Sequence, residues 1–115
     1  MTHTSMSSLC EMQSQTKQML HDLGFPCHRV GYYQLLLAIP KYSLDRRQSL
    51  SKEVYTYVAD YWGYSDWRAV EHAIRIVILQ TWLSRNPRAW DLYFPGLRKA
   101  PSNKLFIATL AERLT

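Results

Sequence analysis

The chain has 115 residues, of which 47% are hydrophobic and 13% aromatic, a composition that fits one compact domain and excludes a disordered chain. Lysine and arginine number 14 against 9 acidic residues, and the net charge of +5 suits a polyanionic partner such as nucleic acid. No apolar run approaches the roughly 20 residues of a membrane-spanning helix, and the N-terminus lacks the pattern of a secretory signal, so we expect a cytoplasmic protein.

The N-terminal stretch, residues 1–8, is polar and is predicted to be a flexible tail, and residues 9–115 are predicted to form one all-α domain of six helices. The first helix should run from Leu9 to Leu23, because Gly24 and then Pro26 form a common C-terminal stop.

The two cysteines, Cys10 and Cys27, are too few for a disulfide framework and fit a reducing compartment. Cys27 lies in an apolar turn and is predicted to be a small buried hydrophobe. The four histidines form no ligand set with the cysteines, so we expect no metal and no cofactor. No activated nucleophile or carboxylate pair indicates an enzyme.

The second helix is expected to begin near Gly31 and to end or kink at Pro40, because proline supplies no N–H and clashes with the preceding turn. The third helix should begin after Ser49 or Ser51 as its N-cap and end at Gly63. Its apolar face is formed by residues spaced four apart, namely Val54, Val58 and Trp62.

The last three helices follow in close succession. The fourth should begin after Ser65 or Asp66 and run to residue 82 or 83. The fifth is short, with Asn86 as its cap and Pro87 in its first turn, where a missing N–H costs nothing. The sixth is capped by Ser102 and carries an apolar side formed by Leu105, Phe106, Leu110 and Leu114.

The third and fourth helices are separated by Gly63, Tyr64 and Ser65, and a short turn containing glycine is typical of a helix-turn-helix. The recognition helix would then be the fourth, at about residues 66–83. Its N-terminal half has an exposed polar stripe, and beyond Arg75 it is apolar all round and is predicted to be buried. A recognition helix needs this arrangement, because its first turns enter the major groove while its end is anchored in the core. The stripe consists of Arg68, Glu71, His72 and Arg75.

The side chains of this stripe suit base recognition. Arg75 can donate two hydrogen bonds to guanine, and Glu71 can accept one from the amino group of cytosine. His72 and Arg68 can reach a base edge or a phosphate. The alternative is a solvated helix face on which Glu71 and Arg75 form an ordinary i,i+4 ion pair, and periodicity alone does not decide between the two.

Three segments agree in order and spacing with one family of DNA-binding domains. They are residues 20–26 with His28, Gly31 and Tyr32; residues 70–75 (Val-Glu-His-Ala-Ile-Arg) with Trp82; and residues 100–103 and 106–108 with Leu114. Together they resemble the C-terminal effector domain of the stage 0 sporulation protein A family, which initiates sporulation as a response regulator.

The resemblance implies a six-helix domain that binds a short DNA box, contacts RNA polymerase and its sigma factor, and binds DNA as a homodimer or tandem dimer. The base-contacting positions of the family correspond here to Ala69, Glu71, His72 and Arg75. The family has arginine at the positions of Ala69 and His72, so the resemblance supports DNA binding more strongly than any particular operator. Arg68 is a candidate replacement for the first of these arginines.

Two further expectations concern regulation and phosphate binding. Only about 20 residues precede the matched region, too few for the receiver domain of such regulators, so control by phosphorylation in cis is not expected on this chain. Helix N-termini offer unpaired N–H groups that bind phosphate. The phosphate-contacting candidates are therefore Ser51, Lys52, Ser102, Asn103 and Lys104.

A second hypothesis is a protein-interaction module. The altered base-contacting set would fit a domain that pairs with a full-length regulator or with RNA polymerase and modulates it without contacting DNA. Ala69→Arg separates the two hypotheses, because a DNA-binding domain should tolerate it or bind more tightly.

Overall fold

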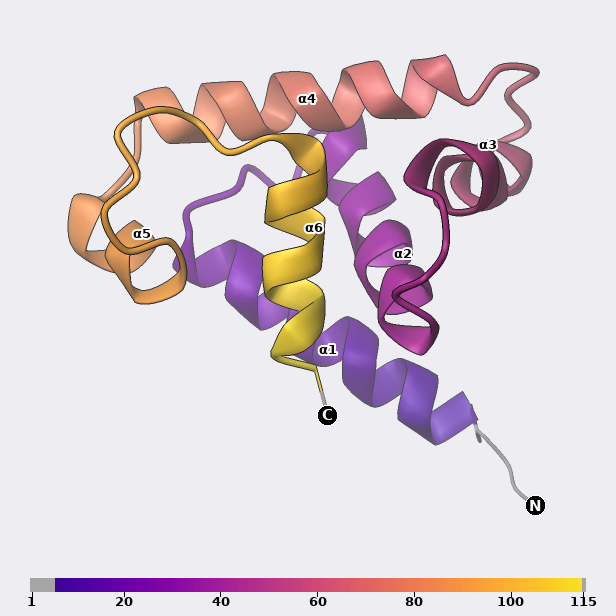
Figure 1. Cartoon of the computed structure of the whole chain (residues 1–115), viewed down its shortest axis with the longest axis horizontal. Helices are drawn as coiled ribbons and strands as arrows, with labels where there is room; N and C mark the ends of the chain where they lie inside the picture. The colour runs from indigo at the N-terminus through magenta and orange to yellow at the C-terminus, as the bar shows by residue number, and fades with distance from the viewer. Residues whose placement is uncertain (1–5, 115) are drawn as a thin grey trace.

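The computed structural model describes residues 6–114, and this part of the chain contains six α-helices, one π-helical segment and no strand (Figure 1). The all-α prediction is confirmed. The elements are α1 (Met6–Asp22), α2 (Val30–Leu44), η1 (Leu50–Tyr55), α3 (Thr56–Trp62), α4 (Arg68–Leu83), α5 (Pro87–Tyr93) and α6 (Asn103–Glu112).

Local side-chain caps define several of the helix starts. The Ser49 hydroxyl accepts a hydrogen bond from the Lys52 N–H, and the Ser102 hydroxyl accepts one from Leu105. The Asn86 side chain caps α5 in the same way, with proline next in the chain. These three caps confirm the predicted starts.

Helices α1 and α2 differ from the prediction at their ends. Helix α1 begins at Met6, within the stretch predicted as a tail, and residues 1–5 of that stretch lie outside the described residues. Helix α2 continues through Pro40 to Leu44, so the predicted end at Pro40 is wrong. An internal proline costs about 3 kcal/mol, but burial of Ile39 and Tyr42 on either side of it contributes about 1.5–3 kcal/mol each.

The segment predicted as the start of the third helix is a π-helical turn. The Val54 N–H donates to the Ser49 carbonyl five residues earlier, at 3.2 Å. The wider turn changes the rotation along the helix, and both Val54 and Tyr55 are buried together with Val58 and Ala59 of α3. An apolar repeat of four cannot distinguish this turn from a regular α-helix.

Helix α2 occupies the centre of the domain and packs against α1, α4 and α6 (Figure 1). An aromatic cluster closes the other side of the core, with Trp90 in contact with Phe25, Phe94 and Phe106. The indole N–H of Trp90 donates to the Leu23 carbonyl at 3.0 Å, so this buried donor is satisfied.

The second half of α4 is not buried all round, contrary to the prediction. Val77 and Ile78 are in the core, but Ile76 and Leu79 are almost two-fifths exposed and Leu83 is 83% exposed. Because α2 and α6 pack on one side of α4, the opposite side faces solvent. Cys27 is also exposed, so the prediction that it is buried is wrong.

Among the described residues, no helix is both long enough and apolar enough to cross a membrane.

Candidate nucleic-acid interface

The α3–turn–α4 unit forms the predicted helix-turn-helix. Gly63 ends α3 with φ of 78°, a left-handed conformation that glycine adopts without strain. The Asp66 carboxylate then accepts a hydrogen bond from the Arg68 N–H at 2.9 Å. This N–H is in the first turn of α4, where N–H groups have no partner within the helix. Helix α4 begins at Arg68, two residues later than expected, so the turn comprises residues 63–67.

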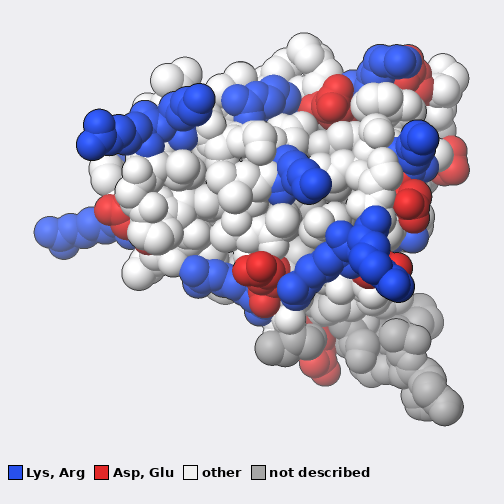
Figure 2. All heavy atoms as spheres, in the orientation of Figure 1, with Lys and Arg blue, Asp and Glu red and all other residues white. Residues whose placement is uncertain are grey.

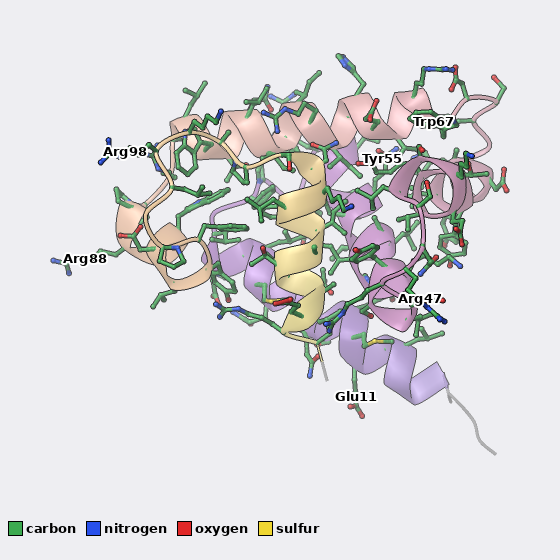
Figure 3. The ribbon with its side chains drawn as sticks, in the orientation of Figure 1. Glu11, Arg47, Tyr55, Trp67, Arg88 and Arg98 are labelled. Carbon is green, nitrogen blue, oxygen red and sulfur yellow. The ribbon has the colours of Figure 1, made fainter. Side chains whose placement is uncertain are left out.

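An aromatic stack holds the start of α4 in place. The ring of Trp67 lies parallel to that of Tyr55 in η1, with centroids 6.1 Å apart and an interplanar angle of 16° (Figure 3). Burial raises the pKa of the Tyr55 hydroxyl, a hydrogen bond with the Asn103 side chain lowers it, and the charge of Glu71 raises it. The net effect is upward, so this hydroxyl remains protonated beneath the site.

Helix α4 presents the predicted stripe to solvent over its first two turns. Arg68, Glu71 and His72 are exposed, whereas Val70 and Ile74 on the opposite face are fully buried. Ala69 is exposed as well. This half of the helix therefore has one face in the core and one face free for a partner.

A shallow groove brings three segments of the chain together at this face. Its walls are the start of η1, the first half of α4, and the loop that leads into α6. Of the predicted base-contacting residues, Glu71, His72 and Arg75 line it. The predicted phosphate-contacting residues that line it are Ser51, Ser102, Asn103 and Lys104.

The remaining predicted residues lie outside this lining. Arg68 forms a salt bridge with Asp66 at 3.4 Å and lies over the Trp67 ring at 5.0 Å. Ala69 is on the exposed face beside it, and Lys52 is exposed in η1.

Two hydrogen bonds connect α4 to the start of α6. The Arg75 guanidinium donates through Nη1 to the Pro101 carbonyl at 2.6 Å, and the Asn103 amide donates to the Glu71 carbonyl at 3.0 Å. The salt bridges in the described part of the chain are Arg47–Asp45 and Arg68–Asp66, so Glu71 and Arg75 do not form the i,i+4 ion pair there. Arg75 is consequently partly buried.

Positive charge predominates around the groove. The exposed Lys99, in the loop before α6, and Lys104, in the first turn of α6, lie on either side of Pro101 in the chain, and Glu71 is the acidic residue in the lining. Figure 2 shows lysine and arginine side chains distributed over this face of the molecule, with fewer acidic ones between them. Such a surface favours a polyanion.

Lys99 and Tyr55 also line the groove and were not among the predicted site residues. Lys99 could have been found from its position three residues before the predicted cap Ser102, because a basic residue near a helix start is a phosphate candidate. Tyr55 carries no such signal, since its place beneath α4 depends on how η1 packs.

Two comparisons with known proteins bear on this arrangement. No curated protein matched the chain. The family model described as Sporulation initiation factor Spo0A C terminal matches residues 16–114, nearly the whole sequence. The matched region contains the helix-turn-helix and all three walls of the groove. The chain belongs to the Spo0A C-terminal family, whose members are DNA-binding regulatory domains.

Proposed function

We propose that this domain regulates transcription by placing the first half of α4 in the major groove of a specific DNA site. The observation that carries the proposal is the convergence of exposed Glu71 and His72 with the starts of η1 and α6 in one groove. A helix with its side chains is about 10–12 Å across, which fits a major groove about 12 Å wide.

Base contacts are assigned to the exposed stripe. Glu71 would accept a hydrogen bond from a cytosine amino group, and His72 would reach a neighbouring base edge. Arg68 and Ala69 lie one turn nearer the helix start, where Arg68 can exchange its contact with Asp66 for a base or phosphate contact. An exposed ion pair of this kind is worth little, so the exchange costs little.

Phosphate contacts are assigned to residues in η1 and at the start of α6. Ser51 in η1 and Ser102 and Lys104 at the start of α6 line the groove, and Lys52 is exposed in η1 outside that lining. Two strands of phosphate border a major groove, and these two segments are the candidates to contact them.

The test begins with selection of binding sites from a random duplex pool. The selected duplex and a scrambled one are then titrated with wild type, Glu71→Ala and Lys104→Ala. Glu71→Ala should weaken binding to the selected site by about 1–3 kcal/mol and relax the preference at one base pair. Lys104→Ala should weaken binding to both duplexes and flatten the salt dependence by about one unit of log–log slope.

The matched control is Glu112→Ala, which removes an exposed carboxylate at the far end of α6. It should leave the preference between the two duplexes unchanged. Equal binding of Glu71→Ala and wild type to both duplexes would refute the assignment. Absence of affinity for any duplex, even after Ala69→Arg, would favour the protein-interaction module instead.

Contacts with RNA polymerase and its sigma factor, and pairing of two copies on DNA, are further predictions from the resemblance. Sedimentation of the domain with duplexes that carry one or two selected sites tests the pairing.

A further inference from the structure

The guanidinium of Arg75 is engaged within the protein at the point where the loop before α6 meets α4. Its bond to the Pro101 carbonyl, at 2.6 Å, joins residues 26 positions apart in the chain. A hydrogen bond from a charged donor is about twice as strong as a neutral one. The Asn103–Glu71 bond, one turn earlier on α4, reinforces the same junction.

The loop held by this bond has few other backbone restraints. It leaves α5 through a 3.4 Å hydrogen bond from the Leu97 N–H to the Phe94 carbonyl and ends at the cap Ser102. Within the described part of the chain, no backbone–backbone hydrogen bond is formed by residues 98–101. Pro101 is buried and has no N–H, so its carbonyl is the one backbone group of this residue that can form a hydrogen bond.

The loop and the first turn of α6 that follows it carry the positive charges of one groove wall. Lys99 and Lys104 lie two and three residues from Pro101, and both are exposed at the groove. A shift of Pro101 relative to α4 would therefore move both ammonium groups relative to the bases that α4 contacts. Arg75 is placed to prevent that shift.

We infer that Arg75 is a positioning residue that sets the phosphate-binding lysines in register with the base-contacting helix. This rests on the proposed function. Of the five N–H groups of the guanidinium, one on Nη1 is bonded to Pro101, and the side chain is partly buried.

The inference is tested first without DNA, by amide hydrogen exchange of the whole chain. Arg75→Ala should accelerate exchange of the Leu105 and Phe106 amides, which bond to Ser102 at the end of the loop, by about tenfold or more, because a charge-assisted bond that anchors the loop is lost. Arg75→Lys keeps a donor and a charge and should restore most of the protection. Arg88→Ala, which removes an exposed arginine that projects away from the body of the domain (Figure 3), should leave the loop unchanged.

The second arm measures binding to the selected and the scrambled duplex over a salt series. Arg75→Ala should weaken both by a similar factor, about tenfold, and flatten the salt slope by up to about two, the contribution of Lys99 and Lys104. Arg75→Lys should recover most of both effects, whereas a lost bidentate guanine contact is not recovered by lysine.

A loss confined to the selected duplex, with the loop exchange unchanged, would overturn the inference and make Arg75 a base-contacting residue. If wild type prefers no duplex, the proposed function fails, but the exchange experiment still decides whether Arg75 holds the loop.

Discussion

Gly31 lies where α2 crosses α4, and Gly31→Ala tests how closely the two helices approach. A Cβ at this position would lie 2.5 Å from the Ala73 carbonyl oxygen and 2.8 Å from a methyl carbon of Val77. Ordinary contacts at such a position are 3.4–4 Å, so the helices would have to separate by about 1 Å. The nearer atom belongs to the backbone of α4 and cannot move away by a rotamer change.

The expected loss of stability follows from two opposing terms. Overpacking of this kind costs about 1–3 kcal/mol, and the rigid backbone contact places Gly31→Ala at the upper end. Alanine is favoured over glycine in a helix by up to about 1 kcal/mol, which offsets part of the cost. The net loss is about 2 kcal/mol, which for a domain of this size lowers Tm by roughly 8–10 °C.

The assay is thermal and urea unfolding followed by circular dichroism. Val77→Ala should relieve the methyl contact and so show a favourable coupling with Gly31→Ala of about 0.5–1 kcal/mol in a double-mutant cycle. Gly24→Ala is the control, because a Cβ there meets nothing within 4 Å and the cost reflects only its φ of 86°. If Gly31→Ala matched or exceeded wild type in Tm, the close crossing of α2 and α4 would be refuted.

Two further predictions concern buried and exposed polar groups. Gln34 is fully buried, and neither polar atom of its side-chain amide has a hydrogen-bond partner among the described residues. Gln34→Leu should therefore raise the urea midpoint of unfolding by the equivalent of about 1–2 kcal/mol. A lower midpoint would show that the amide forms hydrogen bonds in solution. The Arg68 N–H holds the pKa of the Asp66 carboxyl below its usual 3.8, so its stabilisation is present above that pH and is lost as the pH falls through the lowered pKa. Asp66→Ala should therefore lower Tm at pH 7, and the difference from wild type should close below pH 3.8; an equal difference at pH 7 and pH 2.5 would contradict this.

Local chemistry in the sequence was sufficient to predict several of the helix starts and ends. Caps such as Ser49, Asn86 and Ser102 satisfy N–H groups two or three residues away, so their effect does not depend on the rest of the fold. Gly63 ends α3 for an equally local reason, its left-handed φ. The apolar period likewise determined which face of α4 is buried in its first half, and the segments that resemble the sporulation family agree with the family match.

Packing between distant segments decided the rest. The continuation of α2 through Pro40 depends on burial of its neighbours, and the exposure of Leu83 depends on which helices cover α4. The contact of Arg75 with Pro101 joins positions 26 residues apart, and Tyr55 lines the groove because η1 packs against α4 and its ring stacks on Trp67. A periodic pattern shows which side of a helix is apolar, but not how much of that side its neighbours cover or which polar group it meets, because those are set by distances that only the assembled fold defines.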